Sequence, residues 1–179
     1  MTKKYFVTGG SGFIGESIIK RLLTFKNTKV ICFDSNLRGS FKKFKKKTQN
    51  LKLIKGDIRN LNQVVKASKG CDCIIHLAYL NGTQFFYSHP DLVLDIGVKG
   101  MINVIEASKL NKIKKFILAS SSEVYQTPPI IPTPEEVPLI VPNLKNPRYS
   151  YGAGKIISEV LAINNADLFE KMIIFRPHN

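Results

Sequence analysis

The sequence predicts an α/β protein built on a doubly wound parallel sheet of six strands. Short apolar runs of strand length alternate with amphipathic helical patterns along the 179 residues. The first apolar run leads directly into a glycine-rich turn and a helix. This alternation implies right-handed crossover connections and favours the strand order 3-2-1-4-5-6. We expect a single domain, residues 1–179, because 44% of the residues are hydrophobic and no repeat exists beyond the strand–helix unit.

The individual elements follow from hydrophobic periodicity and from the positions of glycine and proline. The nearly all-apolar run 72–78 is typical of a strand buried on both faces. Prolines exclude a helix or a central strand from 127–147 and predict a long loop there, of a kind that is often functional. The predicted strands are 4–8, 29–34, 51–55, 72–78, 112–119 and 172–175, the predicted helices are 12–25, 60–69, 91–109 and 149–169, and 35–50 and 79–90 are predicted loops.

The first turn, Thr8 to Gly15, has the spacing Gly-x-x-Gly-x-x-Gly. Gly9 permits a sharp exit from the strand, Gly12 lets a pyrophosphate approach the backbone, and Gly15 lets the helix pack tightly on the sheet. The free N–H groups and the partial positive charge of the helix N-terminus favour phosphates. The turn therefore predicts a dinucleotide site, and the alternative is a glycine-rich turn of some other α/β protein.

Asp34 ends the second predicted strand, about 20 residues beyond the glycine turn. A carboxylate at that place can accept hydrogen bonds from an adenosine ribose, and it repels a ribose phosphate. It therefore favours NAD over NADP as the cofactor, although the nearby Arg38 tempers that preference. The alternative is an ordinary turn aspartate at a strand end.

A second group of candidate residues lies in the C-terminal half. Tyr151 and Lys155 are four residues apart on a predicted helix, so both lie on one face. A free tyrosine has a pKa of about 10, and a neighbouring ammonium together with the positive nicotinamide of oxidised NAD favours the phenolate. That phenolate can take a proton from a sugar hydroxyl while hydride leaves the carbon. Ser121 is the candidate that orients the same oxygen, whereas His76 is interpreted as a core histidine.

The formal net charge of +14 permits binding to nucleic acid, to an acidic membrane surface or to an anionic small substrate. The densest basic cluster is 41–47, Phe-Lys-Lys-Phe-Lys-Lys-Lys. A basic run with interleaved aromatic residues can bind nucleic acid, and the alternative that we favour is a solvated loop. No apolar run reaches the length of a membrane span, and the N-terminus lacks a signal-peptide pattern.

The three cysteines predict reduced thiols. Cys71 and Cys73 have no second pair with which to form a zinc site, so we expect no metal. An odd number of cysteines without a disulfide pattern is typical of a cytoplasmic protein.

The chain resembles the extended short-chain dehydrogenase/reductase proteins that modify nucleotide sugars, which include epimerases, 4,6-dehydratases and decarboxylases. The resemblance covers essentially the whole chain and implies an NAD-binding Rossmann domain. The matching segments are Thr8 to Gly15, Asp34, Gly56-Asp57-Ile58, His76-Leu77-Ala78, Gly100 with Asn103-Val104, Ser120 to Tyr125, Tyr151 with Lys155, and Arg176-Pro177-His178-Asn179.

The resemblance also implies roles for individual residues. Asp57 and Ile58 would flank the adenine, and Lys155 would hold the nicotinamide ribose in addition to activating Tyr151. The implied cofactor-binding set further includes Phe13, Ile14, Leu77 and Ala78, and the implied substrate-binding set comprises Ser121, Ser122, Tyr151 and Asn179.

The end of the fifth strand, Ser-Ser-Ser-Glu-Val-Tyr, resembles the same segment of the decarboxylases and the 4,6-dehydratases. Glu123 would carry a proton at the sugar carbons, a residue that plain epimerases usually lack. Ser122 occupies the position of an aspartate in the dehydratases, and Gly97 occupies a position where the family often has an asparagine. The implied chemistry is a transient oxidation at sugar carbon 4, and whether it ends in epimerisation, dehydration or decarboxylation stays open.

Members of this family are considerably longer, with a C-terminal part that closes over the nucleotide sugar. We therefore expect that the C-terminal substrate subdomain is absent and that the chain binds NAD but turns over nucleotide sugar poorly or not at all. Two other functions stay open: a catalytically silent NAD-binding or interaction module, and a binder of nucleic acid or acidic surfaces. The resemblance also implies a homodimer formed through the helices 91–109 and 149–168.

Overall fold

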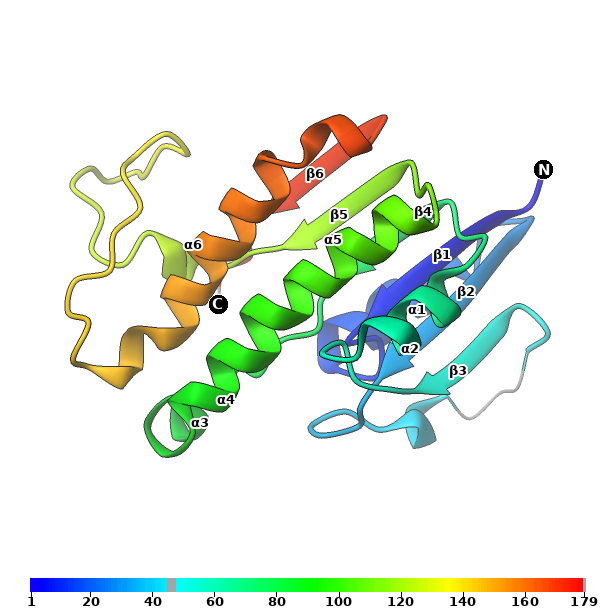
Figure 1. Cartoon of the computed structure of the whole chain (residues 1–179), viewed down its shortest axis with the longest axis horizontal. Coiled ribbons are helices and arrows are strands. Elements are labelled where there is room, and N and C mark those ends of the chain that lie inside the picture. The colour runs from blue at the N-terminus through cyan, green and yellow to red at the C-terminus, as the bar shows by residue number, and fades with distance from the viewer. Residues whose placement is uncertain (45–47, 179) are drawn as a thin grey trace.

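The sheet has the predicted architecture. The computed structural model describes residues 1–44 and 48–178. Its six strands are all parallel and lie in the order β3-β2-β1-β4-β5-β6, which confirms the predicted fold class and strand order (Figure 1). The strands are β1 (Lys3–Thr8), β2 (Thr28–Asp34), β3 (Leu51–Lys55), β4 (Cys73–His76), β5 (Lys115–Ala119) and β6 (Lys171–Phe175). The helices are α1 (Phe13–Leu22), α2 (Leu61–Ser68), α3 (Thr83–Ser88), α4 (Pro90–Leu94), α5 (Gly100–Leu110) and α6 (Ser150–Ile163).

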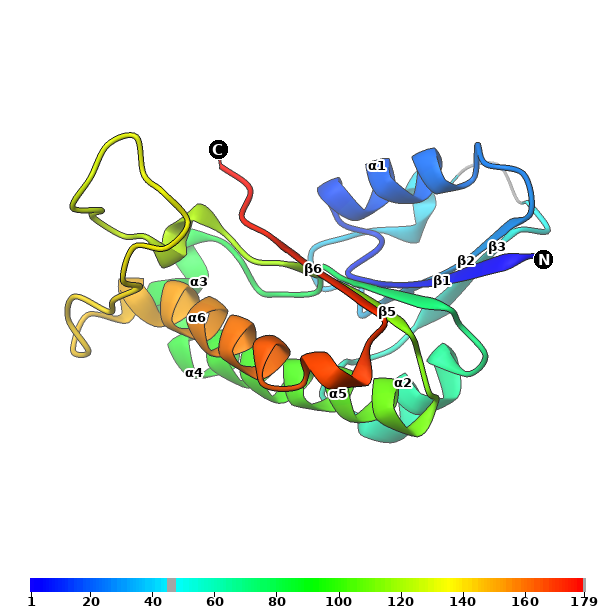
Figure 2. The ribbon, with the colours of Figure 1, turned by 90° about the horizontal axis from the view of Figure 1, so that it is seen from above.

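Helices cover both faces of the sheet. In Figure 2, α1 lies on one face, and α2, α4, α5 and α6 lie on the other. The larger apolar cluster fills the space beneath the second layer and contains the fully buried Phe6, Phe33 and Phe116. A smaller cluster that includes Val7 and Ile19 lies beneath α1. All four residues of β4 are buried, as the uninterrupted apolar run predicted.

The prediction of a loop over 79–90 was wrong, because this segment contains α3. The side chain of Phe86 is 3% exposed and stacks on Tyr151 at a ring-centroid distance of 5.4 Å. Tertiary packing of aromatic side chains therefore stabilises a helix of six residues, which is too short for a periodic signal.

The helix predicted over 91–109 extends from Pro90 to Leu110, with a π-helical turn over Asp95–Lys99 between α4 and α5. Pro90 occupies the first turn of α4. The N–H groups of a first turn make no intrahelical hydrogen bond, so a proline, which lacks this group, is tolerated there. Three elements are shorter than predicted. The helix α1 ends at Leu22 rather than at residue 25, α6 ends at Ile163 rather than at residue 169, and β5 begins at Lys115 rather than at residue 112.

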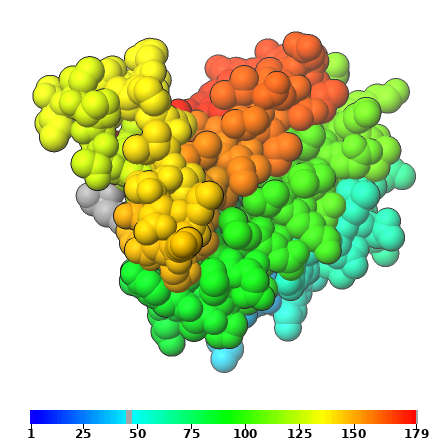
Figure 3. Space-filling view, turned by 60° about the vertical axis from the view of Figure 1, so that its left-hand side comes forward, coloured from blue at the N-terminus to red at the C-terminus, as the bar shows by residue number. Residues whose placement is uncertain are grey.

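The proline-rich segment from 127 to 146 has no regular helix or strand, as predicted. Figure 3 shows it as a lobe that projects from the molecule beside α6. A 3-10 turn, Pro147–Tyr149, leads from this lobe into α6. Val137 is buried against Val124 and Tyr125, so one point of the lobe is attached to the end of β5.

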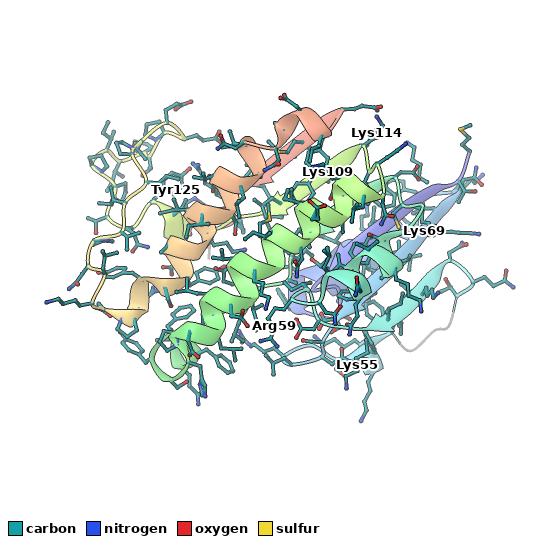
Figure 4. The ribbon with its side chains drawn as sticks, in the orientation of Figure 1. Lys55, Arg59, Lys69, Lys109, Lys114 and Tyr125 are labelled. Carbon is teal, nitrogen blue, oxygen red and sulfur yellow. The ribbon has the colours of Figure 1, made fainter. Side chains whose placement is uncertain are left out.

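The described lysines are spread over the fold. Figure 4 labels Lys55, Lys69, Lys109 and Lys114, which come from β3, the end of α2, α5 and the segment before β5. Of the predicted basic cluster, Lys42 and Lys43 belong to a 3-10 turn, whereas Lys45, Lys46 and Lys47 lie outside the described residues.

None of the helices in the described part is long and apolar enough to cross a bilayer.

Candidate functional site

The glycine turn links β1 to α1 at the carboxyl edge of the sheet. Gly9 has a φ of +68°, and a Cβ at this position would collide with the backbone of Ala78 after β4. A Cβ at Gly15 would overlap Gly9 and Gly10, so this glycine is what lets the helix pack against the turn. A Cβ at Gly12 would meet only the carbonyl oxygen of Gly9, 3.2 Å away. Gly12 is therefore the least crowded of the three glycines, although a Cβ there would still be in tight contact with a backbone oxygen.

The start of α1 is exposed to solvent. Gly12 is the N-cap, and it provides no side chain that could satisfy the first N–H groups of the helix. Phe13 is 85% exposed and Ile14 is 45% exposed, so neither side chain belongs to the core. The turn thus presents unpaired N–H groups and the positive end of a helix dipole, which fits the diphosphate of a dinucleotide.

Asp34, at the end of β2, is joined to the glycine turn. Its Oδ2 accepts a hydrogen bond from the Ser11 N–H (3.0 Å), and its Oδ1 accepts one from the Asn36 N–H (2.8 Å). The Ser11 hydroxyl in turn donates to Asn36 Oδ1 (2.9 Å). The carboxylate therefore lies beside the turn, where an adenosine ribose attached to a bound diphosphate would reach it.

Asp57 and Ile58 follow β3 along the same edge. Arg59 binds Asp57 through its Nη2 (2.6 Å) and Asp95 through its Nη1 (2.8 Å), and the bond from Arg59 lowers the pKa of Asp57. An open hollow of about 610 Å³ is lined by Asp57, Asp95 and neighbouring polar residues. Ile58 is buried against Gly100, and its carbonyl accepts a hydrogen bond from the Asn103 side chain (2.9 Å), so the predicted contact of Ile58 with the adenine stays a prediction.

Leu77 and Ala78 continue from β4 beside Gly9, and both are half-buried. His76, one residue earlier, is buried, and its Nδ1 lies 2.7 Å from the Thr8 hydroxyl. Burial and the nearby Lys155 lower the pKa of His76 to about 3, so the imidazole is neutral. These contacts support its interpretation as a core histidine.

Tyr151, near the start of α6, is 6% exposed and lies between two aromatic rings. Tyr79 packs edge-on against it with ring centroids 5.0 Å apart, and Phe86 stacks on it at 5.4 Å. Burial raises the pKa of Tyr151, while a hydrogen bond with Ser121 acts in the opposite direction. Without a cofactor, loss of hydration therefore outweighs the favourable contacts and opposes the phenolate. The expectation that the neighbouring ammonium together with the nicotinamide of NAD favours the phenolate stays a prediction.

Lys155 lies one helical turn after Tyr151 and is 4% exposed. Its Nζ donates a hydrogen bond to the Ala119 carbonyl at the end of β5 (2.7 Å) and lies 5.7 Å from the centroid of the Tyr151 ring. Burial lowers the pKa of Lys155 to about 7, and Glu159 partly opposes this effect. The lysine and the tyrosine thus share the predicted helix face, but the ammonium is directed at the sheet.

Ser121 and Glu123 lie directly after β5. The Ser121 Oγ accepts a hydrogen bond from the Glu123 N–H (3.2 Å), which leaves its own proton for Tyr151. The Glu123 carboxylate is bound by Arg148 (2.9 Å), whose guanidinium lies 5.3 Å from the Phe86 ring centroid. The Ser122 N–H donates to the Pro177 carbonyl (3.0 Å), so this serine connects β5 to the chain after β6. Asn179 lies outside the described residues.

Sequence reasoning missed an ionic network behind the site. Glu159 on α6 is 3% exposed and accepts two hydrogen bonds from Arg176, to Oε1 (2.9 Å) and to Oε2 (2.7 Å). Ser120 donates to the same carboxylate, and Arg176 also donates to the Tyr125 hydroxyl (2.7 Å). This network holds the serine segment against α6 and β6. The sequence motif Arg-Pro-His-Asn included Arg176, one member of this network. Glu159, the partner of Arg176, belongs to no motif that could have identified it.

The sequence model described as the NAD dependent epimerase/dehydratase family matches residues 5–179. A bifunctional UDP-glucose 4-epimerase and UDP-xylose 4-epimerase of Pisum sativum is 29% identical over 99% of this chain and 52% of its own length. A putative UDP-glucose 4-epimerase of Methanocaldococcus jannaschii is 32% identical over 86% of this chain and 48% of its own length. The chain therefore spans about half the length of the curated relatives it matches.

Solved structures of the same kind have the same fold. A UDP-N-acetylglucosamine 4-epimerase from Methanobrevibacter ruminantium M1, in complex with UDP-N-acetylmuramic acid, superposes with a TM-score of 0.86 at 27% identity, covering 98% of this chain and 54% of that one. A UDP-galactose 4-epimerase superposes with a TM-score of 0.81 at 26% identity, covering 97% of this chain and 55% of that one. In both comparisons, this chain corresponds to about half of the other protein.

Proposed function

Since the chain belongs to the NAD-dependent epimerase/dehydratase family, as its motifs predicted, we propose that it is the cofactor-binding part of a nucleotide-sugar 4-epimerase. The family is NAD-dependent, in agreement with the cofactor expected from the glycine turn and Asp34. The observation that carries the proposal is the shared edge: the glycine turn, Asp34 and Ser121 lie at the carboxyl ends of β1, β2 and β5 of one parallel sheet, and Tyr151 at the start of α6 is hydrogen-bonded to Ser121. In such a sheet, ligands bind outside those strand ends.

The residues divide the proposed work between binding and proton transfer. The N–H groups of the first turn of α1 hold the diphosphate, and Asp34 holds the adenosine ribose. NAD held there would supply a hydride acceptor for carbon 4 of the sugar and the donor that restores it. Ser121 orients the 4-hydroxyl, and Tyr151 removes and restores its proton. Tyr151 would then lie near two positive charges: the Lys155 ammonium, 5.7 Å from its ring centroid, and the nicotinamide of NAD when it is bound.

Epimerisation is favoured over dehydration or decarboxylation by the position of Glu123. Its carboxylate is bound by Arg148, so carrying a proton to a sugar carbon requires that ion pair to open. Epimerisation needs no second acid–base group: Tyr151 would take and return the 4-hydroxyl proton, and the hydride held by NAD would return to the opposite face of the 4-keto sugar. Two relatives that are 29% and 32% identical are also named as 4-epimerases.

Two parts of the proposal concern assembly and location. The face formed by α5 and α6 carries exposed apolar residues, among them Ile102, Val160 and Ile163, which supports a homodimer through these helices. Burial keeps Cys32, Cys71 and Cys73 as free thiols with raised pKa values, which suits a reducing compartment such as the cytoplasm.

The proposal is tested in two steps with the 179-residue chain. Calorimetric titration with NAD and NADP should give measurable binding of NAD, and folded protein that binds neither would refute the cofactor role. Mixing the NAD complex with UDP-glucose, UDP-galactose or UDP-N-acetylglucosamine should then give the near-ultraviolet absorbance of reduced nicotinamide. We expect slow turnover, and we expect Tyr151→Phe to keep NAD binding but abolish the absorbance change. NAD binding without any absorbance change would favour a catalytically silent NAD-binding module.

A further inference from the structure

Tyr79 is a half-buried tyrosine with a buried hydroxyl, and the proposed reaction assigns it no role. It follows β4, and its ring lies between the π-helical turn Asp95–Lys99 and α6. The centroid of the ring is 4.3 Å from Lys155 Nζ. Its hydroxyl is buried without a hydrogen-bond partner among the described residues, and burial raises the pKa of this phenol. Packing, rather than a hydrogen bond, therefore fixes the orientation of the ring.

Two glycines make room for the end of this side chain. A Cβ at Gly97, in the π-helical turn, would overlap the Tyr79 ring, and a Cβ at Gly154 would overlap the Tyr79 hydroxyl. Both glycines lie inside helical segments, where glycine is less favourable than alanine. Neither has a positive φ that would require glycine. The space taken by Tyr79 is thus the reason in this structure for a missing side chain at both positions.

The surroundings of Lys155 are poor in negative charge. The titratable groups that face it are His76 on β4, Tyr79 after β4, and Tyr151 and Glu159 on α6. The Ala119 carbonyl is its hydrogen-bond acceptor at 2.7 Å, and Glu159 is already bound by Arg176. Burial lowers the pKa of Lys155 to about 7, so the ammonium is close to losing its proton. The electron-rich face of an aromatic ring attracts an ammonium at this distance, and the attraction is stronger in a desolvated site.

We propose that Tyr79 is a positioning residue, whose ring holds Lys155 as an ammonium beside Tyr151, and that Gly97 and Gly154 are small in order to admit it. The inference rests on the proposed function, because it assigns a support to the lysine that would activate Tyr151 and hold the nicotinamide ribose. Two experiments test it without NAD or sugar, so their outcome is independent of whether the cofactor and the reaction are correctly assigned.

The first experiment measures the titration midpoint of Lys155 by NMR of its ¹³Cε signal, in the wild type and in two variants of the 179-residue chain. Tyr79→Phe keeps the ring and removes the unpartnered hydroxyl, so the midpoint should not move. Tyr79→Leu removes the aromatic face, so the midpoint should fall by about half to one pKa unit. An unchanged or raised midpoint in Tyr79→Leu, or an equal fall in both variants, would overturn the role of the ring.

The second experiment measures thermal unfolding in a double-mutant cycle of Gly154→Ala and Tyr79→Ala. Next to Tyr79, the added methyl group overlaps the hydroxyl, so Gly154→Ala should lower the Tm. Without the tyrosine ring, the same substitution should be neutral or stabilising, because alanine favours the helix. We expect the two effects of Gly154→Ala to differ by about 3 °C or more. Equal effects in the two backgrounds would overturn the complementarity of Tyr79 and Gly154.

Discussion

The buried His76 predicts a specific dependence of stability on pH. Burial lowers the pKa of His76 from 6.5 to about 3. Between these values the unfolded chain binds a proton on this residue and the folded chain does not, so stability rises with pH across this window and falls on acidification. The slope contributed by one such group approaches 1.36 kcal/mol per pH unit. From about pH 7 to about pH 5, we expect the free energy of unfolding to fall by about 2 kcal/mol through His76.

The environment of His76 shows why this value should be large. The Thr8 hydroxyl accepts a hydrogen bond from the Ala78 N–H (3.3 Å) and can donate to His76 Nδ1 (2.7 Å), an arrangement that protonation of the ring would break. The Phe116 ring lies on one side, at a centroid distance of 6.5 Å. The ammonium of Lys155 adds a like charge to any imidazolium that forms.

The assay is urea unfolding followed by circular dichroism at several pH values, in the wild type and in His76→Asn. Asparagine keeps a polar group near the position of Nδ1 but cannot titrate, so the packing cost of the substitution is the same at every pH. The stability of the variant should therefore depend less steeply on pH, by about 2 kcal/mol between about pH 7 and pH 5. Parallel curves for the two proteins would refute the assignment of a neutral, buried imidazole.

Three further predictions concern the cofactor turn, the helix face and the ionic network. Gly12→Ala should lower the Tm less than Gly15→Ala, whose Cβ would overlap Gly9 and Gly10, and should weaken NAD binding about tenfold or more in calorimetry. An unchanged NAD affinity in Gly12→Ala would contradict the phosphate role. The double variant Ile102→Glu and Val160→Glu should sediment as a monomer where the wild type sediments as a dimer, and equal sedimentation of both proteins would count against this interface. Glu159→Ala leaves the half-buried Arg176 without its carboxylate partner and should cost on the order of 3 kcal/mol in urea unfolding, with a smaller loss in Glu159→Gln; equal losses would argue against the ion pair.

The sequence alone determined the sheet and its cofactor edge. Alternation of apolar runs with helical patterns depends on local periodicity, and the strand order follows from the handedness of the crossovers. The roles of Gly9 and Gly15 in the fold could also be predicted, because a positive φ and a close helix approach leave glycine as the residue that fits. The Tyr151–Lys155 spacing likewise placed both residues on one helical face.

Only the tertiary structure decided what surrounds those residues. The short helix α3, the insertion of Tyr79 between two glycines and the binding of Glu123 by Arg148 all join segments that are distant in sequence. Contacts of this kind have no period and no fixed spacing along the chain, so they cannot be predicted from local sequence patterns. The same reason explains the raised pKa of Tyr151, because desolvation depends on what packs around the phenol rather than on its neighbours in the sequence.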